Sequence, residues 1–222
     1  RDTDRSRGLG DVYKRQFLLC IQLSAALRAS GDDLAANLKF KRFPALNNLP
    51  SDEIQKIYQD KDGFVWLASR YGFYQYDGYE TTLYKSNLYT PGLLTNNNIL
   101  CLVDDYDHNL WVGTQEGLNI LNKKTGEIKK ILSPVIPNNV ISCLLVMRDH
   151  SVWLGTDSGL CKYDAENGTF VVYNRELTGG VLDYTAIKSL LEDSEGDLWI
   201  GTWSSGLYLS LIHISEPTRP IS

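Results

Sequence analysis

Apolar and polar positions alternate in short runs along most of the chain, and acidic, glycine and asparagine residues separate these runs. Alternating runs of about four to six residues predict β-strands, and helical periodicity of useful length is missing from them. In one stretch the expected strands cover residues 99–103, 110–114, 118–122 and 127–132. Four such strands joined by tight turns predict a small antiparallel sheet as the local unit.

A pattern centred on tryptophan recurs four times, at intervals of about 45 residues. An apolar residue precedes each tryptophan, a small pair such as Gly-Thr follows two residues later, and a second glycine follows that pair. The tryptophans are Trp66, Trp111, Trp153 and Trp199, the first glycines are Gly113, Gly155 and Gly201, and the later glycines are Gly72, Gly117, Gly159 and Gly206. Repeats of this length are typical of the blades of a β-propeller.

The residue types suit stacked sheets. A tryptophan in mid-strand offers a large apolar surface to bury between neighbouring sheets, and glycine in a tight hairpin allows a positive φ. We therefore predict an all-β fold of β-propeller blades with four antiparallel strands each. The expected blades are about four in number and lie within 37–208, at about 37–90, 91–134, 135–180 and 181–208. Because a closed propeller usually needs about six to eight blades, we expect an incomplete, partial propeller.

Two histidines occupy the same turn position in neighbouring repeats. His108 and His150 stand where the outer copies have Gly63 and Gly196. This equivalence favours turn residues over metal ligands. We therefore expect no metal site at these histidines.

Both ends of the chain look foreign to the repeats. Residues 1–16 are polar and rich in arginine, and they resemble a translated sequencing adaptor. Residues 209–222 resemble the same adaptor read on the opposite strand. We set both segments aside as non-native, with natural tails as the alternative. The protein is then expected to be an internal piece of a longer one.

An apolar run precedes the first repeat. Residues 17–27 form an apolar run of eleven residues, and a plausible cleavage site follows Ala29, so 17–30 predict a truncated signal peptide and export. The alternative is a buried strand or an amphipathic helix that packs on the first blade.

Composition excludes several functions. The chain has 27 acidic and 22 basic residues, a net charge of −5, and lacks a basic stripe, so we do not expect it to bind nucleic acid.

Cys101, Cys143 and Cys161 show neither metal-ligand spacing nor a disulfide framework. The stretch from Asp60 to Gly63 resembles a calcium loop, but Tyr71 stands where the loop needs glutamate. We expect no catalytic residues, no metal and no cofactor.

The hairpin after the small pair differs between copies, and in a propeller such hairpins share one rim, where ligands usually bind. Aromatic residues there can stack on a sugar ring, and polar ones can bond its hydroxyls. The candidate ligand-binding residues are Arg70, Tyr71, Gln115, Glu116, Asp157 and Trp203. The alternative is that these hairpins are ordinary solvated loops or contacts to a neighbouring domain.

The stretches LPSDEIQKIYQDKDGFVWLASRYGFYQYDG (49–78) and NNNILCLVDDYDHNLWVGTQEGL (96–118) resemble two-component regulator propeller repeats. The resemblance implies an N-terminal fragment of the periplasmic ligand-sensing propeller of a sensor histidine kinase. It also implies an ectodomain anchored in the inner membrane and control of polysaccharide-use genes.

The partners that the resemblance implies are an oligosaccharide or other small ligand and the remaining blades and second propeller of the same chain. It also implies a homodimer in the full-length sensor. The kinase domains would lie outside this fragment, which is therefore not expected to be an enzyme. A secreted propeller lectin or adhesin and a glycan-active propeller enzyme are the alternatives. The aspartates six and four residues before tryptophan disagree with the register of the sialidase motif.

Overall fold

The computed structural model describes residues 39, 53–89, 91–173, 177–180, 182 and 186–210. The chain divides into two compact units, 1–44 and 45–222, and apart from Lys39 every described residue belongs to the second. The predicted adaptor-like segment 1–16 and signal peptide 17–30 lie outside the described residues, as does most of the second adaptor-like segment. Among the described residues, no helix is long and apolar enough to cross a membrane.

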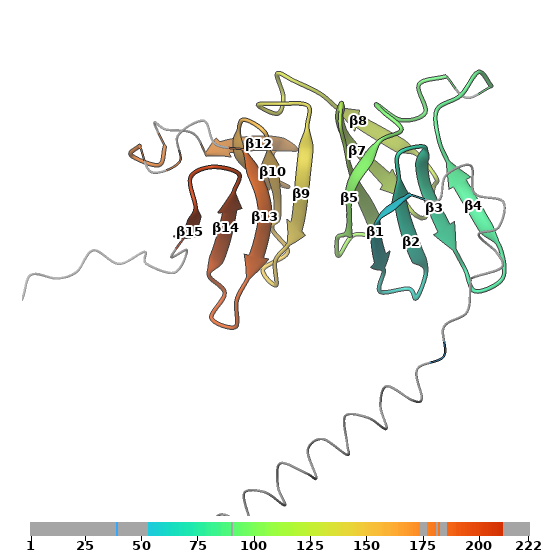
Figure 1. The fold of residues 1–222 in the computed structure, drawn as a ribbon, viewed down its shortest axis with the longest axis horizontal. Helices are drawn as coiled ribbons and strands as arrows, with labels where there is room; N and C mark the ends of the chain where they lie inside the picture. Colours follow the sequence, from blue (N-terminus) through green and yellow to red (C-terminus); the bar gives the residue numbers. More distant parts are fainter. Residues whose placement is uncertain are drawn as a thin grey trace, which may run out of the picture. The chain divides into compact units, whose positions relative to one another are not determined.

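The described part of the second unit consists of antiparallel sheets that follow one another along the chain (Figure 1). The first sheet has the strand order β1 (Ile54–Gln59), β2 (Val65–Ser69), β3 (Gly72–Tyr76) and β4 (Thr81–Tyr84). The second has β5 (Ile99–Asp104), β6 (Asn109–Thr114), β7 (Gly117–Asn122) and β8 (Ile128–Ile131). The third has β9 (Ile141–Val146), β10 (Val152–Thr156), β11 (Gly159–Asp164) and β12 (Thr169–Tyr173).

The fourth sheet has three strands within the described residues, β13 (Ile187–Glu192), β14 (Leu198–Thr202) and β15 (Leu207–Ser210). Leu209 and Ser210 pair with Trp199 and Leu198, so β15 runs two residues past the expected end of the fourth repeat. Strand pairing uses backbone groups that almost every residue has. A repeat boundary predicted from side chains therefore does not show where the pairing ends. The predicted fold class, blades of four antiparallel strands in a partial propeller, is confirmed.

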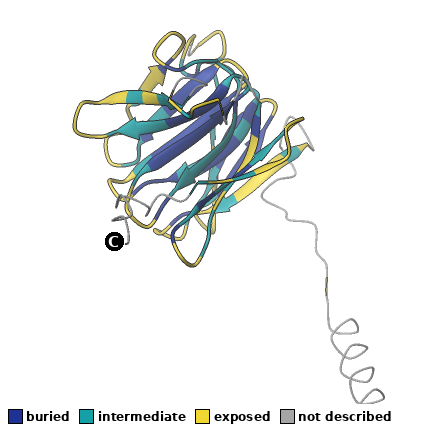
Figure 2. Cartoon of the chain, turned by 90° about the vertical axis from the view of Figure 1, so that its left-hand side faces the viewer, coloured by how far each residue is buried: buried dark blue, intermediate teal, exposed yellow. Residues whose placement is uncertain are grey.

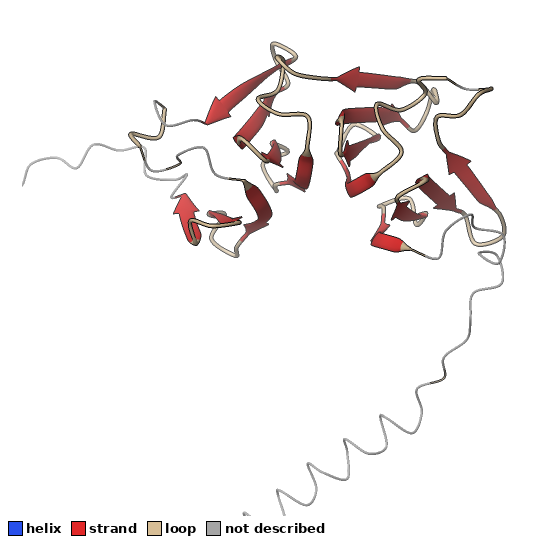
Figure 3. Cartoon of the chain, turned by 45° about the horizontal axis from the view of Figure 1, so that its top comes forward, coloured by secondary structure: helices blue, strands red, loops and turns tan. Residues whose placement is uncertain are grey.

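Neighbouring sheets meet through their first strands, since β1 contacts β5, β5 contacts β9, and β9 contacts β13. Figure 3 shows the successive groups of strands with the loops that join them. Apolar side chains between successive sheets form three core clusters, while loops at the edges are exposed (Figure 2). In each cluster the tryptophan of one repeat packs against the sheet of the next. Trp66, Trp111 and Trp153 are accordingly only 1%, 2% and 4% exposed.

The last tryptophan differs from the other three. Trp199 is only partly buried, and Leu191 and Leu207 of the same sheet are 61% and 65% exposed. Within the described residues no further sheet follows the fourth. The contrast shows that the core side chains of one repeat become fully buried only when the next repeat packs against them.

Candidate functional site

The first strand of every sheet carries a β-bulge at the same place. In the first sheet Ile54 pairs with Ser69 and Lys56 with Ala68, so Gln55 is left outside the register. The other three sheets skip the corresponding residue of their first strands, namely Leu100, Ser142 and Lys188. A bulge redirects the unpaired side chain, and bulges are common at rims and beside binding sites. The bulged residues differ in chemistry, although an isoleucine precedes each of them.

A hydroxyl group closes each hairpin between the second and third strands. In the second sheet Thr114 Oγ1 donates to the Gly117 carbonyl at 2.8 Å and accepts from the Glu116 amide at 3.1 Å. Ser69, Thr156 and Thr202 make the equivalent bonds in the other sheets. The hydroxyl therefore explains why serine can replace threonine in the first repeat.

These hairpins meet the segments that lead into the first strands. The Gln115 amide donates to the Asn98 carbonyl at 3.1 Å, and the Trp203 amide donates to the Ala186 carbonyl at 2.9 Å. Hairpin and bulge therefore lie at the same end of a sheet. We call this end the hairpin rim and define it by the second-to-third-strand hairpins at 70–71, 115–116, 157–158 and 203–205 with the bulged residues 55, 100, 142 and 188.

Two of the predicted ligand-binding residues come together on this rim. Lys188 Nζ donates to Asp157 Oδ1 at 2.6 Å and to Ser142 Oγ at 3.2 Å, and it lies 5.8 Å from the centre of the Trp203 ring. Ser142 Oγ also donates to Asp157 Oδ1 at 3.2 Å. Asp157 of the third sheet and Trp203 of the fourth are thus joined through a lysine that the sequence analysis did not select.

The other four predicted residues lie apart from that cluster. Gln115 accepts a hydrogen bond from Asn98, which in turn accepts one from Gln55 of the first sheet. Arg70 forms an exposed ion pair with Glu53 at 2.9 Å. Tyr71 is 52% exposed, and Glu116 is also exposed. Among the described residues, no hydrogen bond or ion pair joins these four to Asp157 or Trp203.

At the opposite end of the first, second and fourth sheets, an aspartate accepts a hydrogen bond from the tryptophan of its own repeat. Asp105 Oδ1 accepts from the Asp107 and Asn109 amides at 2.8 and 2.9 Å, and Oδ2 accepts the Trp111 indole N–H at 2.8 Å. The same 2.8 Å indole bond joins Asp60 to Trp66 and Asp193 to Trp199. Because a buried indole N–H needs an acceptor, this aspartate is a structural part of the blade.

The third repeat uses a different acceptor for its indole N–H. Met147 replaces the aspartate, and Ser151 Oγ accepts the Trp153 indole N–H at 2.9 Å. His108 and His150 have φ values of 63° and 69°, and Gly63 and Gly196 have 91° and 92°. The predicted role of these histidines as turn residues is confirmed.

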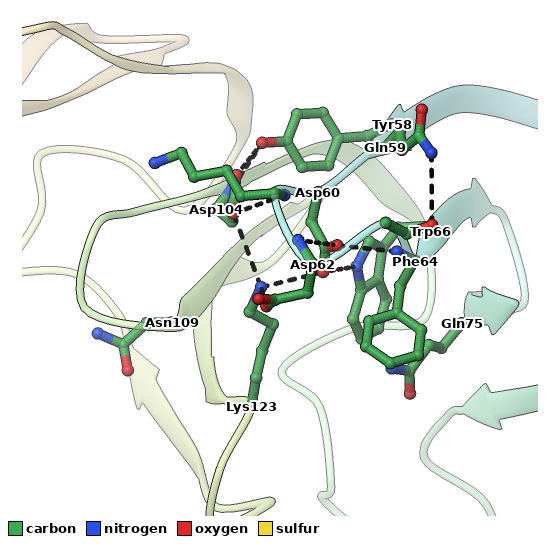
Figure 4. A network of polar contacts seen from close by, with 12 residues as sticks. Tyr58, Gln59, Asp60, Asp62, Phe64, Trp66, Gln75, Asp104, Asn109 and Lys123 are labelled. Atoms are coloured by element: carbon green, nitrogen blue, oxygen red, sulfur yellow. Dashed lines mark hydrogen bonds and ion pairs between the residues drawn. The ribbon is translucent and has the colours of Figure 1, made fainter. Parts of the chain in front are cut away.

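A buried polar network joins the first two sheets at this end (Figure 4). Lys123 Nζ lies 3.0 Å from Asp60 Oδ2, 2.6 Å from Asp62 Oδ2 and 3.6 Å from Asp104 Oδ2. The Tyr58 hydroxyl donates to Asp104 Oδ1. Asp60 and Asp104 have side-chain exposures of 0% and 2%, so the lysine compensates carboxylates that would otherwise be buried without a cation.

The network shifts the pKa values of its members. Burial, followed by the hydrogen bond to Asp104, raises the pKa of Tyr58 above its usual range. Desolvation alone would lower the pKa of Lys123, but the hydrogen bonds to Asp62 and Asp60 outweigh it and raise the pKa. The hydrogen bond from Lys123 lowers the pKa of Asp62. The ammonium and carboxylate forms therefore coexist at neutral pH, which suits an inter-sheet tie rather than acid–base chemistry.

The second and third sheets lack this lysine, because Ala165 stands in the corresponding turn. Asn109 Nδ2 instead donates to Asp105 Oδ2 at 2.9 Å, where Asp60 has Lys123. A hollow of about 340 Å³ lies beside these residues and includes Asp107 in its lining. Asn109 already donates a hydrogen bond to Asp105, so the carboxylate has a partner without a lysine. The hollow lies where the smaller Ala165 replaces the lysine of the preceding sheet.

Turn residues also connect successive sheets. The Lys61 amide donates to Asp104, and the Arg148 amide and guanidinium donate to Glu192 at 2.9 Å. Between the second and third sheets Tyr106 stacks on His150 at a centroid distance of 3.7 Å. Charged and aromatic contacts thus serve the same inter-sheet role at equivalent positions.

The cysteines among the described residues are buried or partly buried. Burial raises the pKa of Cys143 to about 12, and that of Cys161 also to about 12. Burial likewise raises the pKa of Cys101 well above its ordinary value. No group of three or more potential metal ligands occurs within the part of the chain that the structure describes.

The two-component regulator propeller family matches residues 48–71, 93–116 and 182–204. These three segments are similar to two-component regulator propeller repeats. The matched segments each run through the indole-binding aspartate and the tryptophan to the hairpin. The two-component regulator propeller match does not include the third repeat, in which Met147 replaces the aspartate.

Solved structures show the same fold. The extracellular domain of a putative hybrid two-component system of B. thetaiotaomicron is 24% identical with a TM-score of 0.67, covering 76% of this chain and 24% of its own. PorZ of the type-IX secretion system of Porphyromonas gingivalis is 19% identical with a TM-score of 0.54, covering 78% and 28%. Virginiamycin B lyase of Staphylococcus aureus is 16% identical with a TM-score of 0.52, covering 72% and 55%.

The chain therefore spans about a quarter of the length of the two-component ectodomain that it resembles. Sequence comparison with curated proteins gives no match. At these identities the solved structures establish the propeller fold of this chain and leave its ligand open.

Sequence reasoning missed the bulged residues of the hairpin rim. The letters Ile-Ser-Cys read as ordinary alternation, but Ile141 packs in the core cluster between the second and third sheets and Cys143 packs against the cluster between the third and fourth, so the alternation slips at Ser142. A slip of this kind is recognisable as a bulge only when the pairing partner is known.

Proposed function

We propose that this chain is an N-terminal part of the extracytoplasmic, ligand-sensing propeller of a two-component sensor histidine kinase. The proposal rests on the regulator propeller repeats and on the variable, solvent-facing hairpin rim that they carry. Its ligand is a carbohydrate, and its output is the control of genes for polysaccharide use. Trp203 supports a sugar ligand, because this large aromatic side chain is 78% exposed at the rim.

The fragment contributes recognition and no phosphoryl transfer. Export by a signal peptide would place it in the periplasm, as the ectodomain of an inner-membrane protein. The remaining blades and a second propeller of the same chain would complete the ectodomain, which would function as a homodimer. Ligand binding would then favour one arrangement of the two ectodomains and pass this preference to the kinase.

A reporter assay in the full-length sensor tests this function. Cells that carry the sensor and a reporter for its target promoter are exposed to oligosaccharides released from complex polysaccharides. Changing Tyr71 and Trp203 together to alanine should reduce the response at least tenfold. Tyr79→Ala serves as the matched control, because Tyr79 is 90% exposed but lies outside the hairpin rim.

Two outcomes would overturn the proposal. An unchanged response in the double variant would remove the rim from ligand recognition. A secreted lectin or adhesin propeller would bind the same sugars without any reporter response, so binding without a response in the unaltered protein would favour that alternative.

A further inference from the structure

Four side chains from two neighbouring sheets converge on one part of the hairpin rim. Ser142 and Lys188 are the bulged residues of β9 and β13, and Asp157 and Trp203 belong to the hairpins that follow β10 and β14. The hydrogen bonds among Ser142, Asp157 and Lys188 hold the polar groups in place. The arrangement therefore exists before any ligand arrives, which lowers the entropic cost of binding.

The cluster keeps unused bonding capacity that faces solvent. The Lys188 and Asp157 side chains are each 37% exposed, and no described residue binds Asp157 Oδ2. Lys188 has three N–H donors and gives two of them to Ser142 and Asp157. A donor and an acceptor are thus available side by side, next to the ring of Trp203, a residue that is 78% exposed.

We propose that Trp203, Lys188, Asp157 and Ser142 form a subsite for one neutral pyranose ring. This inference rests on the proposed sensing of carbohydrate and specifies where one sugar unit is recognised. The C–H face of the ring stacks on Trp203. Adjacent hydroxyls of the ring accept a hydrogen bond from Lys188 and donate one to Asp157, which a vicinal diol can do with two neighbouring oxygens.

The charge balance sets the class of sugar. Lys188 and Asp157 neutralise each other at 2.6 Å, so the subsite presents no net charge to its ligand. A carboxylate or sulfate on the ring would be attracted by the lysine but would lie against Asp157, and it would break the ion pair to gain a partner. A neutral ring uses both groups without separating them.

Ligand-observed NMR titration of the 222-residue chain tests the subsite. The probes are the methyl glycosides of glucose, galactose, mannose, xylose and arabinose, with methyl glucuronoside as the acidic counterpart. At least one neutral glycoside should bind, and Trp203→Ala and Lys188→Met should each weaken that binding at least tenfold. Trp203→Phe and Lys188→Arg should restore part of it, because they keep a stacking ring and a cationic donor.

Matched controls separate the subsite from general effects. Tyr79→Ala and Lys124→Met change an exposed aromatic residue and an exposed lysine away from the hairpin rim, and binding should stay within twofold. Absence of binding by every neutral glycoside, or equal or tighter binding of the glucuronoside, would overturn the inference. If neutral glycosides bind and the full-length sensor responds, but Lys188→Met changes neither, the sensing function stands and this subsite is wrong.

Discussion

The Sγ atom of Cys143 occupies the space in which a Cβ atom on Gly155 would have to stand. Ile187 Cγ2 of the following sheet lies 2.7 Å from the same point. Gly113 has the equivalent relationship with Cys101 and with Ile141, whose Cγ2 lies 2.8 Å away. Gly113 and Gly155 are thus required because the strand beside each of them and the next sheet both occupy the space of a Cβ atom.

Replacing Gly155 by alanine should therefore destabilise the protein. Overpacking of this kind costs about 1–3 kcal/mol, and urea unfolding followed by tryptophan fluorescence measures it. Gly201→Ala is the matched control, because among the described residues only the Ser189 hydroxyl crowds its Cβ and no next sheet lies against it. An equal loss in the two variants would show that crowding by the next sheet is not the cause.

Trp153→Ala should cost far more stability than Trp199→Ala. Trp153 is 4% exposed and packs against β13 and β14, so its removal leaves a cavity worth about 3–5 kcal/mol. Trp199 is only partly buried within the described residues, so its truncation removes less contact. Denaturant midpoints of the two variants decide the matter, and equal midpoints would contradict the dependence of each repeat on the next.

The Lys123 network should make stability depend on pH at both extremes. The pKa of Lys123 is raised, so its contribution is complete below the ordinary lysine value of about 10.4 and is lost as pH rises through the folded value. The pKa of Asp62 is lowered, so its contribution is complete above the ordinary value of 3.8 and is lost as pH falls through the folded value.

Unfolding free energies measured from acid to alkaline pH check this expectation. Lys123→Met should lower stability at neutral pH and flatten both arms of the profile. Lys124→Met is the matched control, because Lys124 is the neighbouring exposed lysine and its charge is only the smallest of the influences that lower the pKa of Asp62. A profile for Lys123→Met that keeps the shape of the unaltered protein would assign the pH dependence to other groups.

The three described thiols should resist labelling in the folded protein. Cys143 and Cys161 have pKa values of about 12, and burial raises that of Cys101 as well, so thiolate is scarce at pH 8. In a Cys20→Ser background, a thiol reagent at pH 8 should react slowly in buffer and stoichiometrically with three groups in urea. Rapid labelling in buffer would mean that the sheets separate readily.

Much of the fold was accessible from the chain alone. Tryptophan at four equivalent places, glycine in each hairpin and histidine at a positive-φ turn position are choices dictated by the geometry of a single blade. Each such constraint acts over a few neighbouring residues. The repeat, the strand order and the turn role of His108 and His150 could therefore be predicted.

The candidate site was predictable only in part. Asp157 and Trp203 were predicted because their hairpins differ between copies. Lys188, which contacts both of them, was not predicted. Lys188 reaches the rim through a bulge, and a bulge depends on the pairing between two strands. Lys123 likewise joins Asp60 across more than sixty residues, and its role depends on how two sheets face each other.

The sequence by itself determined the architecture of one blade and its repetition, because turn chemistry and strand alternation are local properties. Only the tertiary structure decided which side chains from different blades meet, as Lys188 does with Asp157 and Tyr106 with His150. Such contacts arise from the register of each bulge and from the spacing of stacked sheets. Both are set by the packing of buried side chains from residues far apart in the chain.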